Sequence, residues 1–121
     1  MGRAKGTEVL QAPLLEKIPW LVHGFSTRIG LAKWDTPAAV TSNRTKLIGA
    51  LGVEKIPLAT LRQIHSDVAH VFCAIPEKRS TDSPSGDAAI TSHPGLLLSV
   101  QTADCVAILL ADTKRHVVAA V

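Results

Sequence analysis

The sequence contains no tyrosine, and its two tryptophans and two phenylalanines make up 3% of 121 residues. Proteins that bind single-stranded nucleic acids stack the bases on aromatic side chains, so this scarcity argues against that function. The net charge of +3 does not change the conclusion, because the basic residues occur in separate pairs at the N-terminus and in polar segments. We therefore expect no nucleic-acid partner.

Long hydrophobic runs are also missing, although 46% of the residues are hydrophobic. No segment approaches the roughly 18 apolar residues that are needed to cross a bilayer. The opening segment MGRAKGTEVLQAPLL has neither the continuous apolar core nor the small-residue cleavage site of a secretory signal. We expect a cytoplasmic protein without a membrane partner, and a chain of this length suits one globular domain.

Cysteine is scarce as well, with Cys73 and Cys105 as its two occurrences. Two thiols in a cytoplasmic chain do not make a disulfide framework, so each needs its own explanation. Cys73 lies in the apolar segment VAHVFCAI, which predicts a small buried thiol in a strand. Cys105 lies in a different setting, next to a carboxylate.

One helix is predicted from Pro37 to Leu51. Thr36 is a favourable N-cap, Pro37 suits the first helical position, and Gly52 suits the C-terminal end. Apolar residues recur within this segment at helical spacing, at Val40, Leu47, Ile48 and Leu51.

Most of the remaining chain predicts strands, at 20–26, 58–65, 68–75, 88–91, 96–102, 106–112 and 116–121. Several of these segments are apolar at nearly every position, which predicts burial on both faces. The fold class is therefore α/β, in the α+β sense: a layered sandwich of mixed, largely buried β-sheet covered by helices. The last segment stops without a turn or polar tail, so we expect the chain to be truncated within a central strand.

His65 is the first candidate for chemistry, because it ends an apolar strand beside Ser66 and Asp67. Histidine is the commonest metal ligand, and functional residues are often placed where strands end. A histidine that is simply hydrogen-bonded at a strand end fits the same pattern, so this feature alone leaves both explanations open.

Asp104 and Cys105 are the second candidates, because they interrupt two apolar segments. A carboxylate in such a place is costly unless it is paired or hydrogen-bonded. One explanation is a tight connection in which Asp104 caps backbone groups. The other is a metal site in which Cys105 binds as thiolate and Asp104 supports it or accepts a proton.

Arg44 is the third candidate, because its position falls within the apolar stripe of the predicted helix. It either extends its guanidinium from the edge of the stripe to water or points inward and binds an anion. Arg28, in the loop after the first predicted strand, is placed to bind the same anion. The remaining histidines show no partner pattern and are interpreted as structural or surface residues: His23, His70, His93 and His116.

Five motifs occur together and in order: HGFSTR (23–28), SNRTKLIGALG (42–52), RQIHSD (62–67), GDAAIT (86–91) and QTADC (101–105). As a set they resemble the laccase-domain, or multicopper polyphenol oxidase, family, whose bacterial members are also called peptidoglycan editing factor and purine nucleoside phosphorylase. The resemblance extends from about residue 20 to the end. The chain departs from the family pattern at Leu31, often glycine, and at Ala107, commonly proline.

The resemblance implies a metal site with three protein ligands. Two of them match His65 and Cys105, and the third is the histidine of a His-Ala-Gly-Trp-Arg-Gly motif that follows the strand matching HVVAAV. We therefore expect residues 1–121 to be the N-terminal portion of a single laccase-like domain that continues beyond Val121. With the third ligand in the missing C-terminal part, the fragment itself is expected to be inactive.

The resemblance also implies purine nucleoside phosphorylase activity on adenosine, inosine, guanosine and methylthioadenosine, together with adenosine deamination at a zinc site. Copper suits the same ligands. Arg28 and Arg44 would bind phosphate, the co-substrate, and Asp104 and Arg44 are the catalytic candidates. The alternatives are a copper-dependent polyphenol oxidase and a peptidoglycan-editing or cysteine hydrolase with Cys105 as nucleophile.

Overall fold

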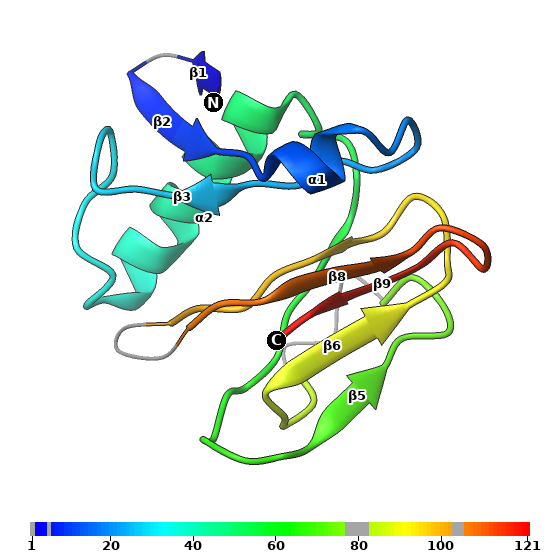
Figure 1. The fold of residues 1–121 in the computed structure, drawn as a ribbon. Helices are drawn as coiled ribbons and strands as arrows, with labels where there is room; N and C mark the ends of the chain where they lie inside the picture. Colours follow the sequence, from blue (N-terminus) through cyan, green and yellow to red (C-terminus); the bar gives the residue numbers. More distant parts are fainter. Residues whose placement is uncertain (1, 5, 77–82, 103–105) are drawn as a thin grey trace. The chain divides into compact units, whose positions relative to one another are not determined.

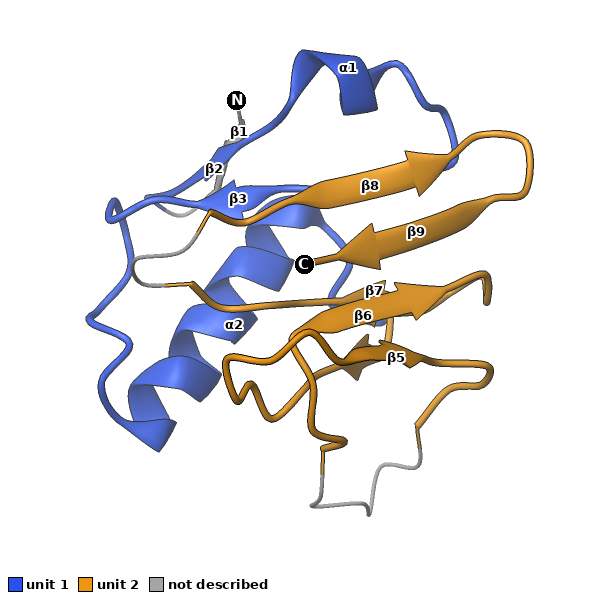
Figure 2. Ribbon diagram, turned by 60° about the horizontal axis from the view of Figure 1, so that its bottom comes forward, with its two compact units in different colours: residues 1–55 blue, residues 56–121 orange. Residues whose placement is uncertain are grey.

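The computed structural model describes residues 2–4, 6–76, 83–102 and 106–121 (Figure 1). The mixed α+β class predicted from the sequence is confirmed. The chain divides into two compact units, residues 1–55 and residues 56–121 (Figure 2). No helix within the described ranges is long and apolar enough to cross a membrane.

Unit 1 is a small antiparallel sheet with a helix packed against it. The strands β1 (Gly2–Ala4), β2 (Thr7–Leu10) and β3 (Phe25–Ser26) pair in that order. A short helix, α1 (Pro13–Glu16), follows β2, and the long helix α2 (Pro37–Leu51) lies against β1 and β2. Val9 on β2 is 1% exposed and provides the apolar centre of this packing.

Helix α2 has the predicted bounds and the predicted caps. The Ala39 N–H donates to the Thr36 hydroxyl at 3.1 Å, which satisfies one of the free donors of the first turn. Gly52 ends the helix in the left-handed conformation with a φ of 73°. These caps depend on short-range sequence signals, which explains why the prediction succeeded.

The face that α2 buries most completely is polar. Asn43 is 0% exposed, whereas the predicted apolar stripe is half-buried. The Asn43 side chain donates to the Ala32 carbonyl at 2.9 Å and accepts from the Ala32 N–H at 3.0 Å. This pair of hydrogen bonds ties the loop after β3 to the helix.

The same loop passes close to the β1–β2 connection at Gly30. Gly30 has a φ of 82°, and a Cβ at this position would lie 2.4 Å from the Gly6 carbonyl oxygen. The Glu8 N–H donates to the Ile29 carbonyl at 3.2 Å. Glycine is therefore required here both by the conformation and by the space.

His23 is a structural residue, as expected. It is 7% exposed, its Nε2 accepts from the Ala12 N–H at 2.9 Å, and its carbonyl accepts from the Gln11 amide at 3.2 Å. The strand predicted over 20–26 is thus too long. Residues before Phe25 are bonded through His23 to residues 11–12, and ladder pairing is confined to β3.

Unit 2 contains two sheets. A parallel pair joins β4 (Leu58–Ala59) to β7 (Leu97–Leu98). The second sheet has the order β5-β6-β9-β8, with β5 parallel to β6 and the other neighbours antiparallel. Its strands are β5 (Ala69–Val71), β6 (Ala88–Thr91), β9 (Val117–Ala120) and β8 (Leu109–Asp112).

The core of unit 2 is one apolar cluster on these sheets, with Leu98 and Val100 packed at its margin. Its buried members are Ala59, Leu61, Phe72, Ala89 and Leu96. Strand β6 supplies Ala89, which is 0% exposed, and has the bounds that the sequence predicted.

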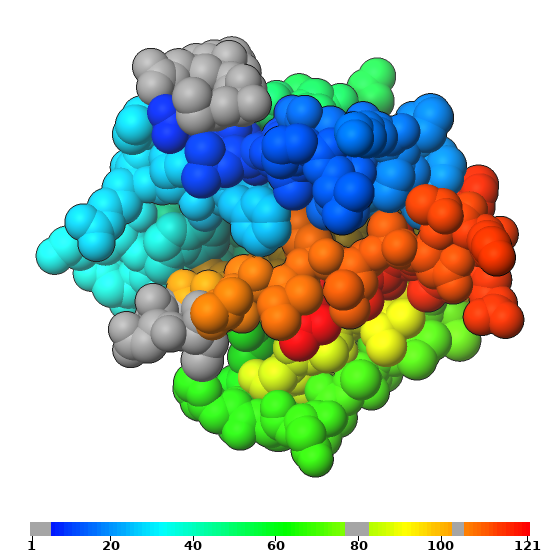
Figure 3. Space-filling view, in the orientation of Figure 1, coloured from blue at the N-terminus to red at the C-terminus, as the bar shows by residue number. Residues whose placement is uncertain are grey.

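Two expectations about buried strands are wrong. Leu110 on β8 is 56% exposed, so this strand is not buried on both faces. The segment that includes β8 lies at the surface in Figure 3. Cys73, just after β5, is also exposed rather than buried, because Phe72 is the residue that this segment turns to the core and its neighbours Val71 and Cys73 are both exposed.

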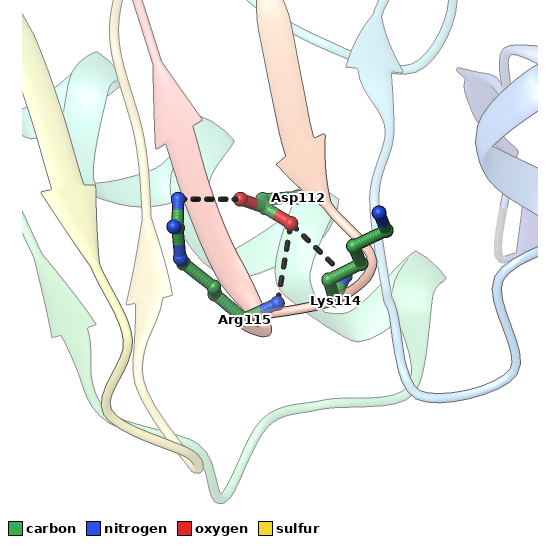
Figure 4. A network of polar contacts seen from close by, with 3 residues as sticks. All are labelled: Asp112, Lys114 and Arg115. Carbon is green, nitrogen blue, oxygen red and sulfur yellow. Dashed lines mark hydrogen bonds and ion pairs between the residues drawn. The ribbon is translucent and has the colours of Figure 1, made fainter.

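The turn between β8 and β9 is held by a carboxylate. Asp112 accepts from the Lys114 N–H at 2.9 Å and from the Arg115 N–H at 3.1 Å (Figure 4). The Arg115 guanidinium lies 3.9 Å from the same carboxylate, in an exposed pair that contributes little to stability.

The Asn43 contacts predict a large stability loss on truncation. Asn43→Ala empties a fully buried position and removes both hydrogen bonds to Ala32, which lowers the free energy of unfolding by about 2–3 kcal/mol. Thr45→Ala, an exposed change on the same helix, is the control and should cost no more than about 0.5 kcal/mol. Urea unfolding measures both. Equal losses in the two variants would contradict the role of Asn43.

Candidate functional site

The predicted site residues are distributed over both units. His65 lies in unit 2, in the turn between β4 and β5, whereas Arg28 and Arg44 lie in unit 1. Asp104 and Cys105 lie outside the described residues, so their geometry stays a prediction. The described part of the unit 2 site consists of His65 and the residues that bond its turn.

Gln63 connects the His65 segment to the segment that contains Cys105. Its side-chain amide donates to the Gln101 carbonyl at 2.7 Å, and its side-chain oxygen accepts from the Gln101 N–H at 2.8 Å. Both polar groups of the amide are thus used on one residue of the other segment. This reciprocal pair places RQIHSD beside the start of QTADC, where the described chain reaches Thr102.

A second connection joins RQIHSD to GDAAIT. Arg62 and Ser85 form a parallel bridge, and the Arg62 N–H donates to the Pro84 carbonyl at 2.9 Å. The Arg62 guanidinium donates to the Ser85 hydroxyl at 2.7 Å and 3.0 Å. The Gly86 N–H returns a bond to the Arg62 carbonyl at 3.1 Å, so the two segments run side by side into the His65 turn.

The carboxylate of Asp87 occupies the centre of that turn. It accepts from the backbone N–H groups of Ile64, His65 and Ser66, at 3.2 Å, 3.1 Å and 2.7 Å, and from the Ser66 hydroxyl at 2.6 Å. Successive N–H groups that converge in this way form an anion-binding nest. The bonds from the Ser66 hydroxyl and amide hold the pKa of the Asp87 carboxyl below its ordinary value.

His65 has an unusual backbone conformation in this turn. Its φ is 57°, in the left-handed region that residues other than glycine adopt infrequently. Its side chain is exposed, and no described residue hydrogen-bonds its imidazole. Hydrogen bonds to the backbone, and not to the imidazole, thus hold His65 in the turn. The ring is left available to bind a ligand.

Arg44 shows an unsatisfied group on the other unit. Its Nε is buried and has no hydrogen-bond partner among the described residues. Burial lowers the pKa of its guanidinium, which still stays charged at neutral pH. A buried charged donor without a partner is costly, and an anion would satisfy it.

Arg28 is exposed and follows β3 in the loop that Asn43 ties to α2. That loop is anchored at Ala32, next to the helical turn that carries Arg44. The convergence of Arg28 and Arg44 on one anion stays a prediction.

Sequence reasoning did not single out Gln63, Asp87 or Gln101. Each is a polar residue within a motif that carried the family resemblance, at the edge of an apolar segment. That repeated placement is a signal that could have found them. Within the described ranges, which leave out Asp104 and Cys105, no three His, Cys, Asp or Glu residues form a metal-binding group.

Comparison with known proteins gives a family and several relatives. The family model of the multi-copper polyphenol oxidoreductase laccase matches residues 23–121. A purine nucleoside phosphorylase of Deinococcus radiodurans is 35% identical over 130 residues, which cover 97% of this chain and 47% of the relative. One of Streptomyces coelicolor is 41% identical over 93 residues, 76% of this chain and 37% of the relative.

A solved structure is similar as well. The crystal structure of a Neisseria meningitidis protein of the DUF152 family is 34% identical, with a TM-score of 0.54, over 72% of this chain and 33% of that one. The chain thus spans half or less of the length of these relatives. Because the family model covers most of the sequence, the chain belongs to the multi-copper polyphenol oxidoreductase laccase family.

Proposed function

We propose that the protein is a purine nucleoside phosphorylase that cleaves adenosine, inosine, guanosine and methylthioadenosine with phosphate, and that it also deaminates adenosine at a zinc site. In this proposal residues 1–121 supply His65 and Cys105 as metal ligands, and a histidine beyond Val121 supplies the third. The printed names of the relatives in Deinococcus and Streptomyces support the reaction class.

The observation that carries the proposal is the reciprocal pairing of Gln63 with Gln101. The two proposed ligands are far apart in sequence, and a metal site needs them close together. The pairing aligns the segment of His65 with the segment that leads to Cys105. A single amide with both of its groups bonded to one residue also fixes the register of the two segments.

The proposed ligand types suit zinc. Imidazole and thiolate are its usual protein ligands, and three of them leave a fourth position open for catalysis. When bound, zinc supplies a Lewis acid that lowers the pKa of water towards about 7. The His65 ring supports this assignment, because it is exposed and unbonded among the described residues.

The arginines have the chemistry to hold phosphate. The planar guanidinium of Arg44 presents donors that match two phosphate oxygens, and its buried Nε has no other described partner. Arg28 would add a second positive charge from the exposed loop. Asp104, next to Cys105, would take up or return the proton that the reaction moves.

Copper-dependent phenol oxidation is the second candidate, and the description of the family model favours it. The same ligands accept copper. A site with one metal does not explain the four-electron reduction of oxygen, so we rank this activity lower. Cysteine hydrolysis or peptidoglycan editing would instead use the Cys105 thiolate directly as the nucleophile.

The two cysteines provide a matched test. In the protein from the complete reading frame, Cys105→Ala should remove bound zinc and lower phosphate-dependent base release at least about 100-fold, because a first ligand is lost. Cys73→Ala, at the exposed cysteine, should leave both unchanged. Zinc content by mass spectrometry and free base by chromatography measure the outcome.

Three results would contradict the assignment. Copper-dependent phenol oxidation without base release would favour the oxidase. Activity that survives metal removal but not thiol alkylation would favour the hydrolase. Tight stoichiometric zinc binding by residues 1–121 alone would contradict a third ligand beyond Val121, because two ligands should bind zinc only weakly.

Arg44 predicts a specific effect on phosphate. Arg44→Gln should raise the KM for phosphate roughly 10- to 100-fold, the value of one or two charge-assisted hydrogen bonds, and leave the KM for the nucleoside nearly unchanged. Lys46→Gln, at an exposed position of the same helix, removes the same charge and is the control. Steady-state kinetics with varied phosphate distinguish them, and equal KM values would refute phosphate binding by Arg44.

A further inference from the structure

We propose that Asp87 is a positioning residue for His65, which it orients through the backbone of the turn and without contact to the imidazole. The inference rests on the proposed function, because it takes His65 as a metal ligand. Asp87 belongs to the GDAAIT segment and would itself bind neither metal nor substrate.

Both carboxylate oxygens of Asp87 accept hydrogen bonds from the turn. Oδ1 accepts from the Ile64 N–H at 3.2 Å and the His65 N–H at 3.1 Å. Oδ2 accepts from the Ser66 N–H at 2.7 Å and the Ser66 hydroxyl at 2.6 Å. Because His65 lies between the other two residues, the carboxylate determines the backbone direction on both sides of its Cα.

Among the described residues, Asp87 is the only hydrogen-bond acceptor of the Ile64, His65 and Ser66 backbone N–H groups. The left-handed conformation of His65 costs roughly 1 kcal/mol for a residue with a Cβ and persists only where the surroundings impose it. The side chains of Ile64 and His65 are exposed, so core packing does not fix them. Without the carboxylate, three adjacent N–H groups would turn to water and the imidazole would lose its direction.

Asp87 is itself attached to the rigid part of unit 2. Its N–H donates to the Val68 carbonyl at 2.9 Å, and the Ala88 N–H donates to the same oxygen at 3.3 Å. Strand β6 begins at the next residue and is paired on both sides, with β5 and with β9. The carboxylate therefore attaches an exposed turn to the end of a central strand and restricts its motion.

The contact requires a carboxylate and not merely a residue of its shape. Asparagine would keep one acceptor oxygen, but its NH₂ group would face backbone N–H donors. Asp87→Asn should thus open the turn while it changes almost no volume. Ser66→Ala removes one of the contacts and should have a smaller effect in the same direction, which provides a second variant if Asp87→Asn folds poorly.

The experiment has a metal-free measurement on the 121-residue chain and a metal-bound measurement on the protein from the complete reading frame, which supplies the third proposed ligand. NMR hydrogen exchange of the Ile64, His65 and Ser66 amides reports the turn without metal, and Asp87→Asn should raise these exchange rates at least about tenfold. Titration with zinc ion alone, followed by the imidazole resonances of His65, reports the ligand. Asp87→Asn should weaken zinc binding roughly 10- to 100-fold, as loss of a supporting partner does at metal sites.

Two aspartates serve as matched controls. Asp67→Asn removes the same charge next to His65, from an exposed side chain outside the Asp87 contacts, and should leave the exchange rates unchanged. Asp112→Asn removes a carboxylate that holds two backbone N–H groups in the β8–β9 turn (Figure 4). It reproduces a general stability loss without contact to the His65 turn, so its zinc affinity should stay close to that of the unaltered chain.

Unchanged amide exchange in Asp87→Asn would overturn the positioning role, as would an equal loss of zinc affinity in Asp112→Asn. Failure of the proposed function would look different. In that case zinc would leave the His65 resonances of the protein from the complete reading frame unmoved, while Asp87→Asn would still raise the exchange rates of the three amides.

Discussion

The hydrogen bonds between the Asp87 carboxylate and the backbone of residues 64–66 are the interaction on which the His65 region depends. Three successive N–H groups point to one side of an exposed turn, and such donors need an acceptor or water. An anchored carboxylate supplies the acceptor and removes the freedom that water would leave. The exposed ring of His65 is thereby presented from a backbone that the adjoining β6 strand holds in place.

Buried or converging polar groups organise unit 1 in a similar way. Asn43, the most buried residue of α2, bonds both backbone groups of Ala32. His23 bonds the Ala12 N–H with its ring. Among the described residues of this small unit, Val9 and Val53 are the only buried apolar side chains. Satisfied polar pairs therefore fix loops that packing alone would leave free. The unsatisfied Nε of Arg44 is an exception to this pattern, and exceptions of this kind often mark function.

Local signals predicted some elements well and others poorly. The bounds of α2 and β6 agree with the sequence, because caps and short apolar runs between turn residues act over a few positions. The strands expected at 58–65 and 106–112 are much shorter in the structure. An apolar run indicates that a segment is buried, but it does not indicate which strand the segment pairs with. Strand pairing and exposure depend instead on residues that are distant in sequence. The prediction that Cys73 is buried was wrong for this reason.

The sequence by itself determined the helix, the α+β class and the candidate residues His65, Cys105 and Arg44, since caps, periodicity and motifs are local properties. The tertiary structure decided which segments meet. The pairing of Gln63 with Gln101, and of Asp87 with the His65 turn, joins residues more than twenty positions apart. No local pattern specifies such contacts, because they form only when the folded chain brings the two segments together.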